Sequence, residues 1–396
     1  MPLVDMKDML GHAYAEGYAV GGFDLVGLEF LDGILRAAEA ERSPVILSLA
    51  ESHFAYYDFD LAMAATVSAA ERARVPVAIH LDHGGSLDSA IAAINRGCNG
   101  VMVDASHRPF ADNVAATRAV VQMAHACGVP VEGELGYVAG VEGEDAERHP
   151  GEVVYTAPEE AARYVAETGV DFLAVSVGTV HGRMRGEPRL DFERLAAIDT
   201  AVGRPLVIHG GTGLSDDQFR RLIGLGVSKI NYYTALADAA AAQVRDNCRP
   251  RAGYTDLLAG VREAVAAETA RCMRVFGSSG RAGAVLAAAR PWRPVEHLIL
   301  YNVEGIGEDE VEARMAEGRE VLARIPGVRR VVTGKAVREE ARYRFCWVVE
   351  FVHEAVIDSY REHPSHRAYA DQRFRPVAAD RISIDYRATG TSIPQP

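Results

Sequence analysis

Three histidines and two carboxylates stand at the ends of short apolar runs in the sequence. Asp82 and His83 end PVAIHLDHG, Glu134 ends VPVEGELG, His181 ends the sixth such run, and His209 ends the seventh. Three neutral imidazoles around one divalent ion leave a position open for a substrate oxygen, which is the usual arrangement of catalytic zinc. We therefore predict a metal site here, and a turn at the end of the strand can bring Asp82 to the same rim. The alternatives are a core or capping role for each histidine and a helix N-cap role for Asp82.

A glycine-rich turn, HGGTG (209–213), follows the seventh apolar run and precedes the helix-like segment SDDQFRRLIGLG. Its glycines let backbone N–H groups approach an anion, and the N-terminus of the following helix favours negative charge. The eighth run, SKINYYT (228–234), carries Asn231. Because loops after the seventh and eighth strands are the common phosphate site of (β/α)8 barrels, we predict that a phosphate group binds here.

The segment 136–156 is long, rich in glycine and acidic residues, and follows Glu134 directly. Long segments of this kind inside a compact domain are usually functional or disordered. We predict a mobile lid that brings Glu142 to the substrate when it closes. A solvated surface loop is the alternative.

Eight short apolar runs alternate with Ala-rich segments of helical period over residues 1–285. Strands that are apolar on both faces indicate a parallel sheet covered by helices. Eight such units in series predict an α/β fold, the (β/α)8 barrel, whose active site forms at the C-terminal ends of the strands. The rival, a doubly wound open sheet, usually has fewer strands and one glycine-rich phosphate loop after the first of them. The eight runs are YAVGGFDL, PVILSLA, PVAIHLDHG, GVMVDAS, VPVEGELG, FLAVSVG, PLVIHGGTG and SKINYYT.

The chain changes character after residue 285. The segment ARPWRP, with two prolines and two arginines, is typical of a linker, which we place at 286–295. The elements expected beyond it follow the order β-α-β-β-α-β, which predicts a ferredoxin-like α+β domain at 296–388. We expect the tail at 389–396 to be disordered.

Composition narrows the possible partners. With 42 Lys and Arg against 55 Asp and Glu, the net charge of −13 argues against nucleic acid, although local arginines and backbone amides can still bind a phosphorylated sugar. No run reaches the roughly 18 apolar residues of a membrane helix, and the N-terminus has no signal-peptide pattern. Five widely spaced cysteines without a CxxC pair indicate reduced thiols. We therefore expect a cytoplasmic protein with a small-molecule substrate and no membrane partner.

Residues 1–285 resemble the class II, metal-dependent ketose-bisphosphate aldolases, most closely the shorter, tagatose-bisphosphate-like branch. The motifs occur in the family's order and at its approximate spacing. They are SPVIL (43–47), HLDHGGS (80–86), VMVDAS (101–106), TRAVVQMAHACGVPVEGELG (117–136), TGVDFLAVSVGTVHG (168–182), LVIHGGTG (206–213), INYYT (230–234) and FGSSG (276–280).

The resemblance implies a role for each residue of the site. The catalytic zinc ligands would be His83, His181 and His209. Asp82 would be the acid/base that serves the C4 hydroxyl, and Glu134 a carboxylate that can ligate a second divalent position. Glu142 would be the lid glutamate that moves the C3 proton. Zinc would polarise the ketone of dihydroxyacetone phosphate and stabilise its enediolate, so no Schiff base is needed, and Lys229 is poorly placed for one.

The family's phosphate and hydroxyl positions also have matches. They fall on Gly182, Gly210, Gly211, Thr212, Asn231 and Thr234. Arg251 matches an arginine that reaches the far phosphate from a neighbouring subunit, which implies a homodimer or homotetramer. Whether a monovalent cation, Na⁺ or K⁺, assists the reaction stays open.

Some positions depart from the family's pattern. Ser48 and Ala50 stand where a Gln and a Ser are usual, Ser52 and His53 replace small residues, and Tyr233 replaces an Asp or a small residue. Tyr232 lies beside the last of these. The changed positions are the ones expected to touch the aldehyde. We therefore predict an aldolase that keeps its dihydroxyacetone phosphate half-site and takes a non-standard aldehyde.

Residues 296–386 resemble the stress-responsive dimeric α/β-barrel (Dabb) family, through His297, IPGV (325–328), an aromatic third strand and YREHPSH (360–366). Such a domain exposes one sheet face, so we expect it to dimerise. Tyr360 and His366 match a pair that is catalytic in one cyclase relative. Three hypotheses follow: a zinc aldolase with a dimerising appendage, a bifunctional aldolase and cyclase, and a non-catalytic sugar-phosphate binding protein.

Overall fold

The computed structural model of the chain describes residues 2–138, 140–145, 154–183 and 188–388, and for 141–145 the backbone only. Its contacts divide the chain into two compact units. The first comprises 1–90, 98–122 and 130–291, and the second comprises 91–97, 123–129 and 292–396.

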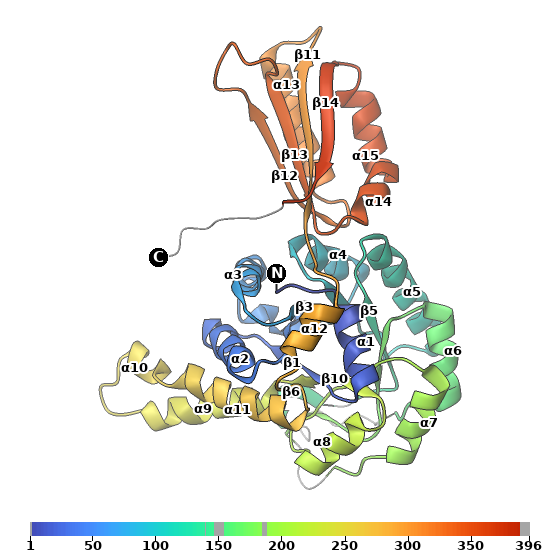
Figure 1. The fold of residues 1–396 in the computed structure, drawn as a ribbon, viewed down its shortest axis with the longest axis vertical. Helices are drawn as coiled ribbons and strands as arrows, with labels where there is room; N and C mark the ends of the chain where they lie inside the picture. Colours follow the sequence, from blue (N-terminus) through green and yellow to red (C-terminus); the bar gives the residue numbers. More distant parts are fainter. Residues whose placement is uncertain (1, 139, 146–153, 184–187, 389–396) are drawn as a thin grey trace. The chain divides into compact units, whose positions relative to one another are not determined.

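The first unit is a closed parallel barrel, as the alternation of apolar runs predicts. Its strands follow one another around the barrel in the order β1-β10-β9-β7-β5-β4-β3-β2, with helices outside them (Figure 1). The strands are β1 (Val20–Asp24), β2 (Val45–Ala50), β3 (Val77–Gly84), β4 (Gly100–Val103), β5 (Val131–Leu135), β7 (Phe172–Val175), β9 (Leu206–Ile208) and β10 (Val227–Tyr232).

The helices of this unit alternate with the strands. They are α1 (Met6–Glu16), α2 (Leu28–Glu41), η1 (Glu51–Ala55), α3 (Phe59–Arg72), α4 (Leu87–Arg96), α5 (Phe110–Ala126), α6 (Pro158–Thr168), α7 (Phe192–Val202), α8 (Asp216–Ile223), α9 (Thr234–Asn247), α10 (Tyr254–Leu258), α11 (Val261–Val275) and α12 (Ala282–Ala288). In the described part of the chain, no helix is both long and apolar enough to cross a membrane.

Helix α1 precedes the first strand and was not among the expected elements. Met6, Met9 and Leu10 on this helix are fully buried, in one cluster with strand residues such as Ile46 and Phe172. A Cβ on Gly100 would lie 2.2 Å from the sulfur of Met6, so glycine lets the helix approach the barrel closely. Burial of these side chains removes apolar surface from water and stabilises the helix on the barrel.

The expectation that His181 ends the sixth barrel strand is wrong. The strand, β7, ends at Val175, and His181 begins a separate short strand, β8 (His181–Arg183). β8 pairs with β6 (Gly140–Asp145) in a two-stranded sheet. Gly178 turns the chain between the two strands with φ +109°, and a Cβ there would lie 2.4 Å from the carbonyl oxygen of Arg189. His181 is therefore positioned by a turn and a small sheet.

The second unit has a four-stranded antiparallel sheet in the order β12-β13-β11-β14, with helices against one face (Figure 1). Its element order, β-α-β-β-α-β, is the ferredoxin-like one that the sequence predicts. The elements are β11 (Val295–Val303), α13 (Glu308–Leu322), β12 (Val328–Lys335), β13 (Phe345–Phe351), α14 (Val356–Glu362), α15 (Pro364–Tyr369), the π-helical turn η3 (Ala370–Phe374) and β14 (Ala378–Tyr386). Helix α12 extends three residues into the predicted linker, and the predicted tail at 389–396 lies outside the described residues.

Alternation along the strands gives this sheet one face toward its helices and one away from them. Phe345, Trp347, Val349 and Phe351 of β13 are buried, whereas the residues between them are half-buried. On the outer face, Ile382 and Ile384 of the edge strand β14 are 50% and 56% exposed. Large apolar side chains on an exposed sheet face are typical of a surface that another protein covers.

Candidate active site

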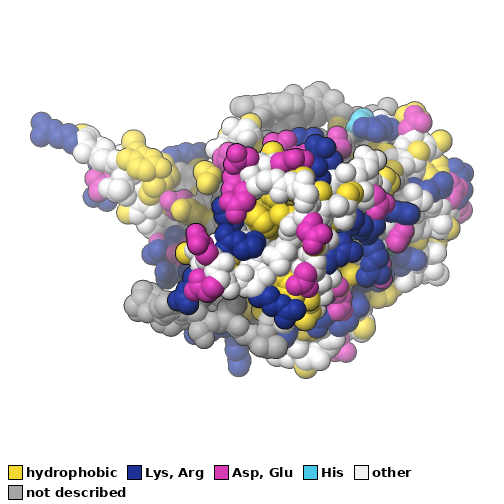
Figure 2. Space-filling view, turned by 90° about the horizontal axis from the view of Figure 1, so that it is seen from above, with side chains coloured by type: hydrophobic (Ala, Val, Ile, Leu, Met, Phe, Trp, Pro, Cys, Tyr) yellow, Lys and Arg dark blue, Asp and Glu magenta, His cyan; other side chains and the backbone are white. Residues whose placement is uncertain are grey.

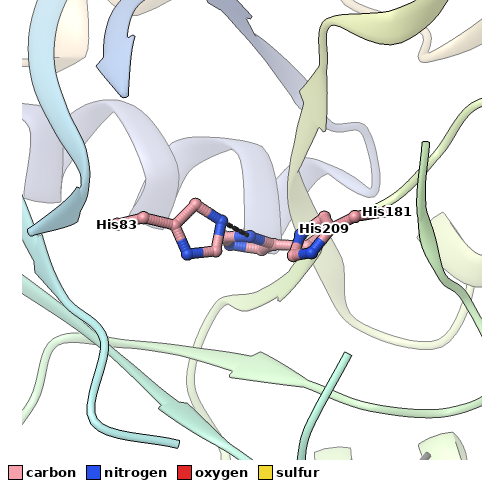
Figure 3. A group of neighbouring side chains, drawn as sticks. All are labelled: His83, His181 and His209. Carbon is pink, nitrogen blue, oxygen red and sulfur yellow. Dashed lines mark hydrogen bonds between the residues drawn. The ribbon is translucent and has the colours of Figure 1, made fainter. Parts of the chain in front are cut away.

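The three predicted histidines lie together, His83 and His209 at the ends of β3 and β9 and His181 at the start of β8. Nε2 of His83 lies 2.9 Å from Nδ1 of His209, and each of the three rings has its centroid within 5.7 Å of the other two. Figure 3 shows the three rings facing one another. One nitrogen from each ring lies within 4.8 Å of the others, which is close enough for all three to hold one ion.

Two of these rings are oriented by carboxylates that the sequence analysis missed. Nδ1 of His83 donates to Asp104 over 2.8 Å, and Nε2 of His209 donates to Glu132 over 2.9 Å. Glu132 also accepts a hydrogen bond from Nζ of Lys229 over 2.7 Å, and both of these side chains are fully buried. Carboxylates that hold the second ring nitrogen are typical of metal-binding histidines. A charged residue inside each of the two apolar runs was the signal that could have found Glu132 and Lys229.

The third ring, His181, is buried, and its Nε2 has no hydrogen-bond partner among the described residues. Burial lowers the pKa of His181 well below its usual value, and the neighbouring His83 and His209 lower it further. This imidazole is therefore neutral at pH 7 and can donate its lone pair. A buried, neutral, unpartnered nitrogen beside two oriented rings fits a divalent cation such as zinc.

Asp82 lies at the C-terminal end of β3, completely buried. Its Oδ1 accepts a hydrogen bond of 2.8 Å from Nδ2 of Asn231, and its Oδ2 lies 3.9 Å from Nε2 of His83 without a hydrogen-bond partner among the described residues. Burial raises the pKa of Asp82, but His83, His209 and Lys229 outweigh it and hold the pKa below its usual value. The result is a carboxylate with one oxygen fixed and the other available.

Glu134 lies on β5, with one oxygen that has no hydrogen-bond partner among the described residues. It forms a second group of three possible metal ligands with His83 and Asp104. Burial raises the pKa of Glu134 to about 8, with a further rise from Asp104 and a partial offset from His83. The geometry thus brings Glu134 close to His83.

The predicted phosphate-binding residues come from three adjoining segments. Gly210 and Gly211 follow β9 directly, Gly182 follows His181 in β8, and Asn231 and Thr234 lie at the junction of β10 and α9. Gly210 has φ +69°, and a Cβ there would lie 2.1 Å from the carbonyl oxygen of Val180. The turn after β9 and the turn before β8 therefore approach so closely that only glycine fits. Thr212 lies in the same glycine-rich turn.

Two further predicted residues, Arg251 and Glu142, lie on other segments of the chain. Arg251 lies in the exposed loop between α9 and α10. Figure 1 shows these two helices extending away from the barrel. Glu142 lies in β6, and its side chain is outside the part of the chain that the structure describes, as are residues 146–153 of the predicted lid.

The second unit brings its three predicted residues to one cavity of about 260 Å³. The rings of Tyr360 and His366 have centroids 4.3 Å apart, and Nδ1 of His297 donates to Asp385 over 2.7 Å. Nδ1 of His366 donates to the carbonyl oxygen of Arg361 over 3.1 Å. Both histidines therefore keep Nε2 as the atom with a lone pair.

The geometry defines a class of protein, a (β/α)8 barrel with three clustered histidines that could hold a metal ion. Residues 4–281 match the family "Fructose-bisphosphate aldolase class-II", and residues 295–388 match the "Stress responsive A/B Barrel Domain". The chain belongs to the class-II fructose-bisphosphate aldolase family and carries a Dabb domain after the barrel. It is an aldolase, a carbon–carbon lyase.

Individual relatives agree with this assignment. A probable fructose-bisphosphate aldolase of Bacillus subtilis (strain 168) is 43% identical over 288 residues, which is 71% of this chain and 100% of the relative. A fructose-bisphosphate aldolase of Geobacillus stearothermophilus is 44% identical over 289 residues, 71% of this chain and 99% of the relative. Among solved structures, the YdjI aldolase from Escherichia coli K12 has a TM-score of 0.64 and 36% identity, covering 71% of this chain and 99% of that one.

Proposed function

We propose that the barrel is a zinc-dependent aldolase that makes or cleaves the bond between dihydroxyacetone phosphate and an aldehyde. The observation that carries the proposal is the set of three facing imidazoles, with the unpartnered nitrogen of His181, beside the buried carboxylate Asp82. Zinc, held by His83, His181 and His209, would supply a Lewis acid for the ketone oxygen. Glu134, beside His83 and Asp104, would hold a second divalent ion.

The chain's own groups account for the proton transfers. In cleavage, the free oxygen of Asp82 takes the proton of the hydroxyl that becomes the aldehyde, and in synthesis it returns that proton. The amide of Asn231 fixes the other oxygen and so orients the carboxylate. Glu142 would move the proton at C3 of dihydroxyacetone phosphate.

The phosphate of the substrate would lie on the turn after β9 and the start of α9. Backbone N–H groups of Gly210, Gly211 and Thr212 can converge there because the two glycines have no side chain. The N-terminus of α9, at Thr234, adds a favourable field for an anion. Gly182 and Asn231 would complete this half of the site.

The test is proton exchange without any aldehyde. Zinc-loaded protein is mixed with dihydroxyacetone phosphate in D₂O, and deuterium at the hydroxymethyl carbon is followed by NMR. We expect exchange in the wild type and its loss in His209→Ala, because that variant lacks a metal ligand. Asp82→Ala should keep exchange but lose cleavage by a factor of about 10²–10⁴, since Asp82 serves the aldehyde half. No exchange at full zinc occupancy would overturn the choice of dihydroxyacetone phosphate.

A second function, in the Dabb domain, is favoured by one observation, the cavity that holds Tyr360, His366 and His297. Burial raises the pKa of Tyr360, and burial lowers the pKa of His366. A neutral phenol and a neutral imidazole can donate and accept a proton, so this cavity could act on the aldol product. Unchanged product identity and rate in Tyr360→Phe and His366→Ala would leave the domain a dimerising role only.

The remaining assignments are also proposals. The barrel domain occupies 1–285, the linker 286–295 and the Dabb domain 296–388. We propose a cytoplasmic homodimer or homotetramer in which Arg251, in the loop between α9 and α10, reaches the substrate of a neighbouring subunit. Acidic and basic side chains are interspersed over the face seen in Figure 2, which gives nucleic acid no uniform basic surface there.

A further inference from the structure

Two aromatic residues that depart from the family's pattern meet beside the catalytic carboxylate. His53 lies in η1, directly after β2, and Tyr233 follows β10. Their ring centroids are 4.5 Å apart, although the residues are 180 positions apart in the chain. The strand before His53 ends at Ala50, which pairs in register with Asp82.

Neighbouring side chains fix this pair in place. Phe30, from the start of α2, has its ring centroid 6.4 Å from that of Tyr233. The carboxylate of Glu51 accepts hydrogen bonds from the backbone N–H of Gly85 over 2.7 Å and from the hydroxyl of Ser89 over 2.8 Å. These bonds tie η1 to the loop that follows His83 and to the first turn of α4, so His53 is held close to His83. We call Phe30, His53 and Tyr233 the aromatic wall.

The aromatic wall lies where we expect the aldehyde to bind, near Asp82. Asp82 exchanges a proton with the oxygen of the aldehyde. The substituent on the carbonyl carbon of the aldehyde must therefore lie close to Asp82. The strands β10, β1 and β2 are neighbours, and the wall stands at the ends of β10 and β2. Tyr233 directly precedes α9, so the wall begins beside the place proposed for the phosphate of dihydroxyacetone phosphate. It extends from there to η1, which follows β2, and the last residue of β2 pairs with Asp82.

The side chains of the aromatic wall offer no cation to an anionic aldehyde. The wall itself contains no lysine or arginine. Asp24, at the end of β1 and in register with Ser48, adds a buried carboxylate at the adjoining strand end. A phosphate placed here would meet aromatic rings and a carboxylate, and burying an unpaired anion is costly. A flat, uncharged group would instead pack on the rings and gain from removing apolar surface from water.

We propose that the aldehyde substrate carries a flat, uncharged group, as in an aromatic or conjugated aldehyde, and that His53 and Tyr233 are the residues that select it. This inference rests on the proposed function of the barrel, because it needs Asp82 to serve the aldehyde oxygen. Specificity of this kind is a difference in kcat/KM between competing aldehydes.

The experiment uses zinc-loaded full-length protein, dihydroxyacetone phosphate and two competing aldehydes, benzaldehyde and glyceraldehyde 3-phosphate. Formation of each aldol product is measured by NMR, and proton exchange without aldehyde is measured in the same preparation. We expect kcat/KM for benzaldehyde to exceed that for glyceraldehyde 3-phosphate by about tenfold or more. Exchange together with a preference for glyceraldehyde 3-phosphate would overturn the inference and leave the proposed function standing. Absence of exchange would overturn both.

Variants then test the residues. Tyr233→Ala and His53→Ala should each lower the ratio of the two kcat/KM values by about tenfold, which corresponds to about 1.4 kcal/mol. Each rate is normalised to the variant's own exchange rate, so damage to the metal site is corrected. Tyr56→Ala is the matched control, because Tyr56 neighbours His53 but is 75% exposed. Equal losses for both aldehydes in the two wall variants would show that the wall does not select between them.

Discussion

At the scale of residues, a carboxylate orients two of the three rings that we propose as metal ligands, His83 and His209. Asp104 orients His83 and also accepts hydrogen bonds from the backbone and hydroxyl of Ser106. Burial raises the pKa of Asp104, but these hydrogen bonds and the charge of His83 lower it below its usual value. Asp104 is therefore a carboxylate that positions His83, which we propose as a metal ligand, without itself needing to touch the substrate.

Asp104→Asn should weaken zinc binding by about 10–100-fold, because an amide orients the His83 ring less firmly and does not raise its basicity. The dissociation constant is measured by competition with a chromophoric chelator. Asp112→Asn, on the exposed first turn of α5, is the control and should leave the constant unchanged. Equal constants for wild type and Asp104→Asn would contradict this role.

At the scale of elements, the site depends on turns that approach one another at the ends of the strands. Gly210 and Gly213 lie in the same turn after β9 and both have positive φ, +69° and +91°. A Cβ on Gly210 would collide with the backbone at Val180, whereas a Cβ on Gly213 would have no atom within 4 Å. Both glycines therefore need a positive φ, but only Gly210 also lacks room for a side chain.

Gly213→Ala should cost about 1–2 kcal/mol of unfolding free energy, the penalty for a left-handed L-residue. Gly210→Ala should cost more than Gly213→Ala, and it should also weaken the binding of dihydroxyacetone phosphate because the turn must move away from β8. Urea unfolding and calorimetric titration measure the two effects. Equal destabilisation by the two substitutions would show that the close contact at Val180 is unimportant.

The elements that carry the site differ in how well the sequence predicts them. The eight barrel strands are continuous apolar runs between helical segments, so their number, order and polar ends were predictable. The place of His181 was not, because β7 is short and β8 has only three residues that pair with a distant segment. The partners Asp104 and Glu132 lie 21 and 77 residues from the rings they orient, and no local pattern connects them.

At the scale of the whole molecule, the outer face of the second unit's sheet exposes apolar side chains. Leu298 pairs with Ile384 and Leu300 with Ile382, so apolar side chains form a band across β11 and β14. Val332 of β12 lies opposite Val348 of β13 and is 39% exposed. A second copy of the chain would bury this band by two-fold symmetry.

Ile384→Glu should shift the protein toward a smaller assembly, because it places a charge in the apolar band that a second copy would bury. Sedimentation velocity over a range of protein concentrations measures the change. Asp358→Lys, at an exposed position in α14 on the other side of the sheet, is a charge-changing control that should leave the assembly unchanged. An unchanged sedimentation coefficient in Ile384→Glu would argue that this face does not form the contact.

Buried thiols and phenols make the free energy of unfolding depend on pH. Burial raises the pKa of Cys98, Cys127 and Tyr164 above their usual values, that of Cys127 to about 12. These groups ionise near pH 8.5–10 in the unfolded chain but stay neutral in the folded one. The unfolding free energy should therefore fall as the pH rises above about 9. Urea unfolding in reducing buffer at pH 7.5 and 9.5 measures it, and an equal or higher midpoint at pH 9.5 would contradict the prediction.

The measurement that tests the central claim most directly is the rate of deuterium exchange into dihydroxyacetone phosphate as a function of bound zinc. The metal-free full-length protein is loaded stepwise, and bound zinc per chain is measured on the same samples. The account predicts that exchange rises in proportion to zinc until one ion per chain is bound at the three histidines. Full exchange in metal-free protein, or none in the zinc-loaded protein, would contradict it.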